Sequence, residues 1–173
     1  MPSQGDLGLL DSPIAQKMLN STDMAQLAYV WTDGTPRVVP IWFHWNGREI
    51  VVASPPAAPK VKALRQQPEV AVTINSTQWP YNVLLIRGRA SVEVVEGIPP
   101  EYTAAARRYM GEEQGQAWLN QFSQIMPQTA RIAVRPEWVG TLDFETRFPS
   151  AVESAMARTR VVGVARGVDQ TFL

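Results

Sequence analysis

Short apolar runs, rich in β-branched and aromatic residues and separated by glycine and proline, recur along the chain and predict a mostly β protein. The first three predicted strands cover 24–31, 37–45 and 48–53. Between them lie Asp33-Gly34 and Asn46-Gly47, residue pairs that favour tight hairpin turns. We therefore expect an antiparallel meander at the start of the sheet.

Two further strands are predicted over 70–75 and 81–95. Gly88 interrupts the second of them, and a glycine inside a strand indicates a bulge or a close approach of another backbone. A final ribbon covers 129–134 and 138–146, and Arg135-Pro136 is expected to break it.

Helical spacing of apolar residues predicts helices over 13–19, 60–66, 101–110 and 112–126. Ser12-Pro13 is a favourable opening for the first, and Pro59 opens the second. From Phe148 onward no clear pattern is present. We expect one split-barrel domain over 1–147 and a C-terminal tail over 148–173, with six or seven antiparallel strands in a closed or split barrel.

Composition excludes several classes of site. The 173 residues carry 16 basic and 16 acidic side chains, so a general nucleic-acid or membrane-surface role has no electrostatic support. The absence of cysteine and the single histidine, His44, exclude disulfides, thiolate catalysis and histidine-rich metal sites within one chain. We expect no metal. No signal peptide and no membrane span are recognisable, which predicts a soluble, cytoplasmic protein.

Motifs of hydrolases, dinucleotide-binding folds and P-loop enzymes are absent, whereas a bound flavin would need none of them. The clearest candidate anchor is the run from Ser54 to Lys62, between a strand end and a helix N-terminus, where a phosphate is favoured. Ser54 can donate a hydrogen bond, and Lys60 and Lys62 can add charge. An ordinary loop with two solvated lysines is the alternative.

Other polar residues leave two interpretations open. His44 is a candidate catalytic residue or haem ligand, or a packed strand residue. Arg87 and Arg89 flank Gly88 and point the same way, so they can bind a phosphate or pair with surface acids such as Glu93.

The aromatic residues are expected to pack. Trp42 must point to the opposite face of its strand from Phe43 and Trp45. The helix 101–110 is expected to present a solvated charged face, whereas the helix 112–126 is expected to pack on the barrel. The residues concerned are Tyr102, Arg107, Arg108 and Tyr109 in the first helix and Trp118, Leu119 and Phe122 in the second.

The run PRVVPIWFHWNGREIVVASPPAAPKVKALRQQPEVAVTI resembles the core of the pyridoxamine-phosphate-oxidase-like split β-barrels. It is especially similar to the flavin/deazaflavin oxidoreductases, whose members use FMN or coenzyme F-420. A D-G-x-P hairpin, a P-x-W-F strand, K-x-x-x-L, P-x-V-A-V-T and R-G-R-A follow one another in the order seen there. The match covers about 24–95 well and the last ribbon more loosely.

The resemblance implies a set of cofactor-binding residues. Family members contact the isoalloxazine ring through barrel strands, hold the phosphate in a strand-to-helix loop, add a basic residue from the long strand, and close the pocket with a W-P pair. The corresponding positions are Val38, Val39, Pro40 and Ile41 for the ring, Ala53, Ser54 and Lys60 for the phosphate, Arg87 or Arg89, and Trp79-Pro80. A polyglutamate tail of the deazaflavin would favour extra cations such as Lys62, Arg65 or Arg37.

Two functions from different classes follow. The first is an oxidoreductase that transfers hydride from FMN or the deazaflavin to a small organic substrate, with a proton from water or from a tyrosine such as Tyr81. The second is a non-catalytic flavin- or haem-binding protein. The resemblance also implies a homodimer. Vitamin B6 oxidation is not expected, because the C-terminal R-x-H-x-R pattern of that enzyme is missing: FETRFPSAVES contains no histidine.

Overall fold

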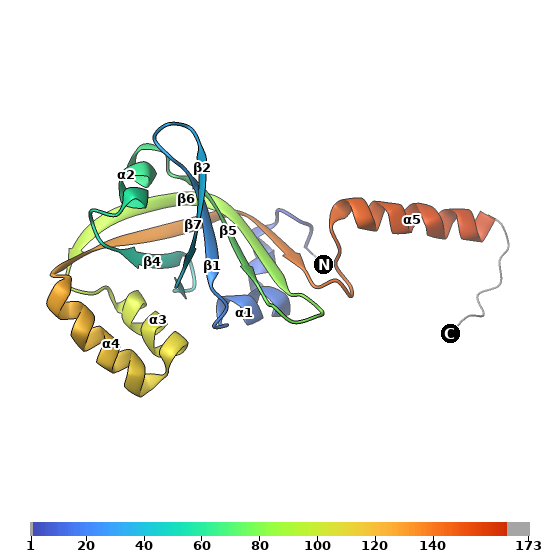
Figure 1. Ribbon diagram of the computed structural model, residues 1–173. Coiled ribbons are helices and arrows are strands. Elements are labelled where there is room, and N and C mark those ends of the chain that lie inside the picture. The colour runs from blue at the N-terminus through green and yellow to red at the C-terminus, as the bar shows by residue number, and fades with distance from the viewer. Residues whose placement is uncertain (1, 166–173) are drawn as a thin grey trace.

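The computed structural model describes residues 2–165, with side chains described up to residue 159. Its centre is a seven-stranded sheet with the order β2-β1-β5-β6-β7-β4-β3, in which every neighbouring pair is antiparallel (Figure 1). The strands are β1 (Ala25–Val30), β2 (Pro36–Ile41), β3 (His44–Trp45), β4 (Ile50–Ser54), β5 (Glu69–Asn75), β6 (Val83–Glu96) and β7 (Gln128–Leu142).

The helices lie close to the expected ranges. A short 3-10 helix η1 (Leu7–Asp11) precedes α1 (Pro13–Leu19), α2 (Pro59–Gln66), α3 (Pro100–Met110), α4 (Glu112–Ile125) and α5 (Ser150–Ala165). The side chain of Ser12 accepts a hydrogen bond from Ala15 N and so caps α1. Val61, Ala63 and Leu64 bury the apolar face of α2 against the barrel core, as their spacing predicts.

The single strand expected over 37–45 is wrong, because the structure divides it in two. The first part, β2, pairs with β1 at one edge of the sheet, and the second part, β3, pairs with β4 at the opposite edge. Only Trp42 and Phe43 join the two edges. The sheet must therefore curl until its two edge strands, β2 and β3, are neighbours. These edges do not pair with each other, so the barrel stays open along one side. This is the split barrel that the sequence predicts.

The side-chain alternation expected in this segment is confirmed at the junction. Phe43 is fully buried in the core, whereas Trp42 is partly exposed and lies under α3. A two-residue link between sheet edges thus sends one aromatic ring into the barrel and the other out of it.

Gly88 marks both a bulge and a close approach, as expected. The pairing of β6 with β7 shifts between Arg87 and Gly88, and a Cβ atom at Gly88 would lie 2.0 Å from Arg135 O. The break expected at Arg135-Pro136 is wrong: β7 runs through it as one strand. Pro136 lies opposite Gly88, at the irregularity where a strand tolerates the missing proline N–H.

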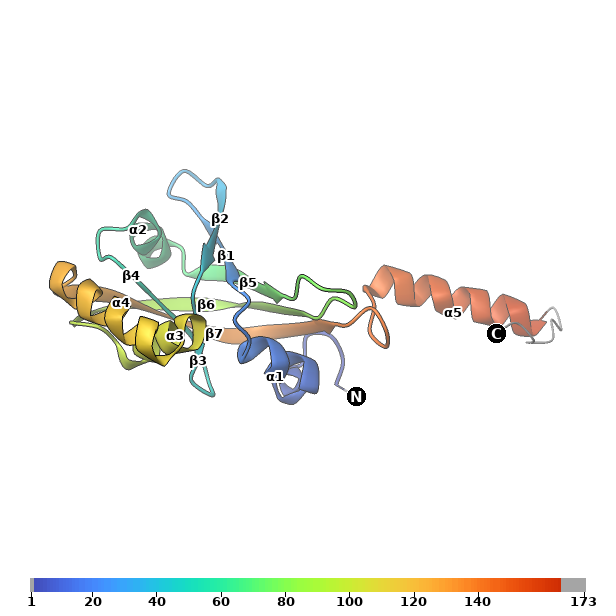
Figure 2. The ribbon, with the colours of Figure 1, turned by 60° about the horizontal axis from the view of Figure 1, so that its bottom comes forward.

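The tail, whose sequence shows no clear pattern, contains the helix α5. In both ribbon views α5 projects away from the barrel (Figures 1 and 2), and its side chains from Ser150 to Thr159 are exposed. Residues 166–173 of the predicted tail lie outside the described part of the chain. Within that described part, no helix is long and apolar enough to cross a membrane.

Candidate functional site

A cavity of about 480 Å³ opens on the outer face of the barrel, between the ends of β2 and β4 and the helices α3 and α4. This volume lies within the usual range for pockets that take small ligands. Its lining consists of Met24, Pro40, Ile41, Trp42, Ala53, Tyr102, Met110 and Trp118. The cavity is therefore largely apolar and aromatic, with few hydrogen-bonding groups.

Trp42 is the central wall of this cavity. Its ring stacks on Tyr109 with a centroid distance of 5.1 Å and an interplanar angle of 6°, and meets the edge of Trp118 at 6.5 Å. Tyr109 is anchored from behind, because its hydroxyl donates a hydrogen bond to Asp23 O at 3.1 Å. Burial raises the pKa of Tyr109, so this hydroxyl keeps its proton at neutral pH.

The expectation of a solvated charged face on α3 is wrong for three of its four residues. Tyr102 lines the cavity and Tyr109 packs behind it. Arg108 lies over the ring of Phe43, with 4.8 Å from its guanidinium carbon to the ring centroid, and donates a hydrogen bond to Phe43 O. Only Arg107 is exposed, and it pairs with Glu112.

The aromatic residues of α4 pack mainly on α3. Trp118 Nε1 donates a hydrogen bond to the Tyr102 hydroxyl at 3.0 Å, and the rings of Phe122 and Tyr102 lie 5.1 Å apart. Trp118 also contacts Trp42 in the link between β2 and β3. The predicted barrel contact is thus made through Trp42, and α4 forms the outer wall of the cavity.

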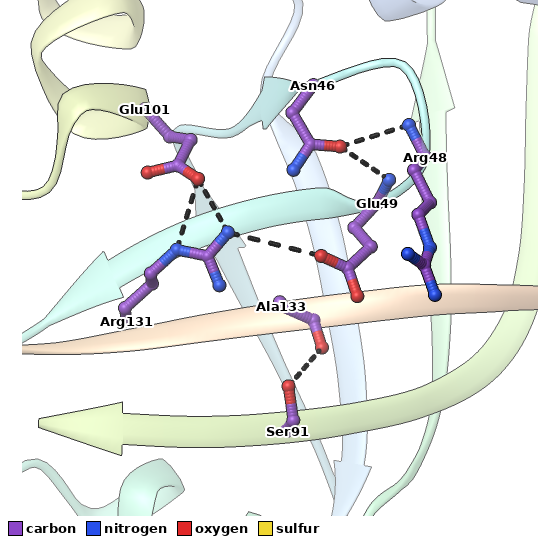
Figure 3. A network of polar contacts seen from close by, with 7 residues as sticks. All are labelled: Asn46, Arg48, Glu49, Ser91, Glu101, Arg131 and Ala133. Carbon is purple, nitrogen blue, oxygen red and sulfur yellow. Dashed lines mark hydrogen bonds and ion pairs between the residues drawn. The ribbon is translucent and has the colours of Figure 1, made fainter.

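A polar network fastens α3 to the barrel beside the cavity. Glu101 accepts hydrogen bonds from Arg131 Nε at 3.1 Å and Nη2 at 2.5 Å (Figure 3). Arg131 on β7 also lies 4.0 Å from Glu49, whose backbone N–H is bound by the side chain of Asn46. Because Glu101 precedes Tyr102 directly, this network fixes the helix end that carries a cavity wall.

His44 belongs to this polar region, and it does not line the cavity. Its neighbours include Arg108 and Glu101. Burial and the charge of Arg108 lower the pKa of His44, so the ring is neutral at pH 7. Its Nδ1 atom is buried and has no hydrogen-bond partner among the described residues, and the same holds for Glu101 Oε2 and Arg108 Nε.

The candidate phosphate loop follows β4 directly. Ala53 faces the cavity, whereas the alternation along the strand turns Ser54 toward the other face. Ser54 is buried, and its Oγ has no partner among the described residues. Residues 55–58 then lead to α2, whose N-cap residue, Ala58, offers no side-chain oxygen to the first turn. In that turn Pro59 has no N–H and the N–H of Val61 donates to Ala58 O at 2.9 Å, which leaves the N–H of Lys60 free within the described part of the chain.

Lys60 stands in that first turn of α2. Its side chain is half-buried, and burial lowers its pKa. None of the ion pairs formed among residues 2–159 includes Lys60. A half-buried cation together with the free backbone N–H of the same residue can bind a phosphate. Lys62 is exposed on the next turn.

The structure brings only part of the predicted site together. Pro40, Ile41 and Ala53 line the cavity. Val38 is 62% exposed on the outer face of β2, and Val39 packs toward the core. Val38 and Val39 directly precede the cavity residues Pro40 and Ile41 in the sequence, but neither lines the cavity.

Trp79 and Pro80 line a second cavity of about 370 Å³, together with residues that include Lys17 and Asp23. Trp79 is 67% exposed and touches Tyr81 and Phe144 rather than the first cavity. Tyr81, the tyrosine named as a proton donor, is thus also outside the first cavity.

The two arginines beside Gly88 make contacts with other side chains on the surface of the barrel. Arg87 lies over the ring of Trp138 at 4.1 Å, and Arg89 pairs with Glu69. Sequence reasoning did not assign the cavity residues of the helices, Tyr102, Met110 and Trp118. For Tyr102, the available signal was its seven-residue spacing from Tyr109, which places both aromatic rings on one side of a helix.

Comparisons with known proteins agree with this architecture. A sequence profile of pyridoxamine 5'-phosphate oxidase matches residues 13–143. No curated protein sequence is similar enough to count as a relative.

Solved structures share the fold at low sequence identity. An F420 reductase is 23% identical, with a TM-score of 0.56 over 72% of this chain and 94% of its own. A conserved hypothetical protein from Mycobacterium tuberculosis is 16% identical, with a TM-score of 0.63 over 83% and 91%. The heme storage protein HutZ from Vibrio cholerae is 22% identical, with a TM-score of 0.55 over 76% and 93%.

These neighbours include proteins named for a deazaflavin and for heme, so their likeness establishes the fold and leaves the ligand open. The profile match, in contrast, spans every strand of the sheet. The chain belongs to the pyridoxamine 5'-phosphate oxidase family of split β-barrels.

Proposed function

We propose that this chain is an oxidoreductase that binds FMN or the deazaflavin coenzyme F-420 and reduces a small organic substrate. The observation that carries the proposal is the apolar cavity of about 480 Å³, lined by Pro40, Ile41 and Ala53, the last of which directly precedes Ser54 at the end of β4. The family resemblance puts the cofactor ring at Pro40 and Ile41 and the phosphate at Ala53. The aromatic rings of Trp42, Tyr102 and Trp118 give the slot flat walls.

The residues present fit such a cofactor at both of its ends. The cavity offers a planar ring apolar and aromatic walls, while the side chain of Lys60 and its backbone N–H would hold a phosphate. The bound cofactor supplies the hydride, and the protein supplies orientation and shelter. Exposed Lys62 and Arg65 would accept an anionic tail, which makes the deazaflavin the slightly favoured cofactor.

Haem fits the cavity less well. His44, the single histidine of the chain, lies beside Glu101 and Arg108 and is absent from the cavity lining. A haem bound there would have no imidazole for its iron. The position of His44 outside the cavity favours a flavin over haem, and haem is therefore the competing ligand in the test.

The test is equilibrium binding of FMN, coenzyme F-420 and haem to wild type, Lys60→Ala and Arg158→Ala, followed by fluorescence or absorbance. We expect Lys60→Ala to weaken binding of the phosphorylated cofactor about tenfold, because one charge-assisted hydrogen bond is lost. Arg158→Ala, which removes an exposed cation on α5, should bind as wild type does. Riboflavin, which lacks the phosphate, should bind equally well to wild type and Lys60→Ala.

Binding of haem alone would refute the proposed function. Equal weakening of FMN and riboflavin by Lys60→Ala would leave the cavity as a flavin site and remove the phosphate anchor.

A homodimer is part of the proposal. Trp79 is 67% exposed and lies outside the first cavity of its own chain, so it would close that cavity only from another subunit. Val38, beside Pro40, is also exposed and apolar. We expect a dimer in sedimentation velocity and weaker cofactor binding in Trp79→Ala. A monomer with full cofactor affinity would contradict this arrangement.

A further inference from the structure

The hydroxyl of Tyr102 has an unused proton at the cavity wall. Trp118 Nε1 lies 3.0 Å from this hydroxyl, and an indole nitrogen is a donor only. The Tyr102 oxygen must therefore accept in that bond. Among the described residues, no other hydrogen bond involves this hydroxyl, so its own O–H remains available.

The ring that carries this O–H is held firmly in place. Its centroid lies 5.1 Å from that of Phe122 and 6.2 Å from that of Trp42. The preceding residue, Glu101, is bound to Arg131 by two hydrogen bonds. Because both the ring and the helix end are fixed, the position of the hydroxyl is set before any ligand arrives.

The hydroxyl also keeps its proton at neutral pH. Burial raises the pKa of Tyr102, and the hydrogen bond from Trp118 opposes this effect without cancelling it. The group is thus a neutral donor in a lining that is otherwise mostly apolar. In such a setting, one placed polar group decides which ligand edge is accepted.

We propose that the Tyr102 hydroxyl donates a hydrogen bond to a carbonyl oxygen on the edge of the planar ligand held in the cavity. The inference rests on the proposed function and names the specificity-determining residue of that site. A neutral donor favours the ligand form with more negative charge on the acceptor. For a ring that carries carbonyl groups, this is the reduced form.

Tyr109 supplies a matched control seven residues further along the same helix. It is half-buried like Tyr102, and burial likewise raises its pKa. Its proton, however, is already donated to Asp23 O at 3.1 Å. Tyr109→Phe therefore removes a hydroxyl of the same kind that is not available to a ligand.

The experiment measures the dissociation constant and the reduction potential of bound FMN, or of coenzyme F-420 if that binds more tightly, in wild type, Tyr102→Phe and Tyr109→Phe. We expect Tyr102→Phe to weaken binding about tenfold, by loss of one buried hydrogen bond, and to make the potential more negative. Tyr109→Phe should match wild type in both. Near-ultraviolet circular dichroism should show that the aromatic cluster stays intact in each variant.

The outcomes separate the two proposals. If wild type binds neither cofactor, the proposed function fails and this inference fails with it. If wild type binds and Tyr102→Phe leaves both the affinity and the potential unchanged, the hydrogen bond alone is refuted. Equal losses in both variants would also refute it, because they would assign the effect to packing of α3.

Discussion

Replacing Gly88 by alanine is expected to lower the free energy of unfolding by about 3 kcal/mol, at the upper end of the cost of overpacking. The added Cβ would lie 2.0 Å from the carbonyl oxygen of Arg135 and 3.2 Å from the Cα of Pro136. Both obstacles are backbone, so no side chain can move aside. Relief requires β6 and β7, the two longest strands, to separate locally.

Thermal unfolding followed by circular dichroism measures this effect. A loss of this size corresponds to a decrease of about 10 °C in Tm for a chain of this length. Glu93→Gln, at an exposed position on the same strand, serves as the control and should change the free energy by less than about 0.5 kcal/mol. A Gly88→Ala variant as stable as wild type would mean that the two strands are not in close contact at the bulge.

The second large effect is expected from the pair of Glu101 and Arg131. The side chains of Arg131 and Glu101 are 22% and 13% exposed, and two hydrogen bonds join them. Glu101→Gln should therefore lower the free energy of unfolding by about 2 kcal/mol, as expected for partly buried hydrogen bonds to charged groups. A double-mutant cycle with Arg131→Met should give a coupling of about 1 kcal/mol or more.

The same pair predicts a pH dependence. The hydrogen bond from Arg131 lowers the pKa of Glu101 below its ordinary value of 4.5, against the opposing effect of burial. A carboxylate whose pKa is lower in the folded state stabilises the protein above its unfolded pKa. That contribution is lost as the pH falls through the folded pKa.

The difference in stability between wild type and Glu101→Gln should therefore be full at neutral pH and shrink below about pH 4.5. Urea unfolding at a series of pH values measures it. A difference that stays constant down to pH 2, or a cycle with no coupling, would show that the pair does not hold α3 to β7.

Local sequence patterns were sufficient to predict most of the helices, strands and turns. The Asx-Gly pairs at 33–34 and 46–47 form tight turns with positive φ at both glycines, and Pro13 and Pro59 open helices as expected. These features depend on a few neighbouring residues, whose turn and capping preferences are intrinsic. For the same reason, Gly88 was recognisable as a bulge and a close approach before its partner strand was known.

Of the strand positions proposed from the sequence, Pro40, Ile41 and Ala53 line the cavity, whereas Val38 and Val39 do not. The sequence pattern did not reveal that Trp42 and Phe43 link opposite edges of the sheet. A local run of β-forming residues does not show at which residue the chain crosses from one edge strand to the other. Nor did it place Tyr102 and Trp118 opposite those strands. That wall depends on α3 being bound to β7 through Glu101 and Arg131, a contact between residues far apart in the chain. The tertiary structure alone decided it, because only folding brings such residues within reach.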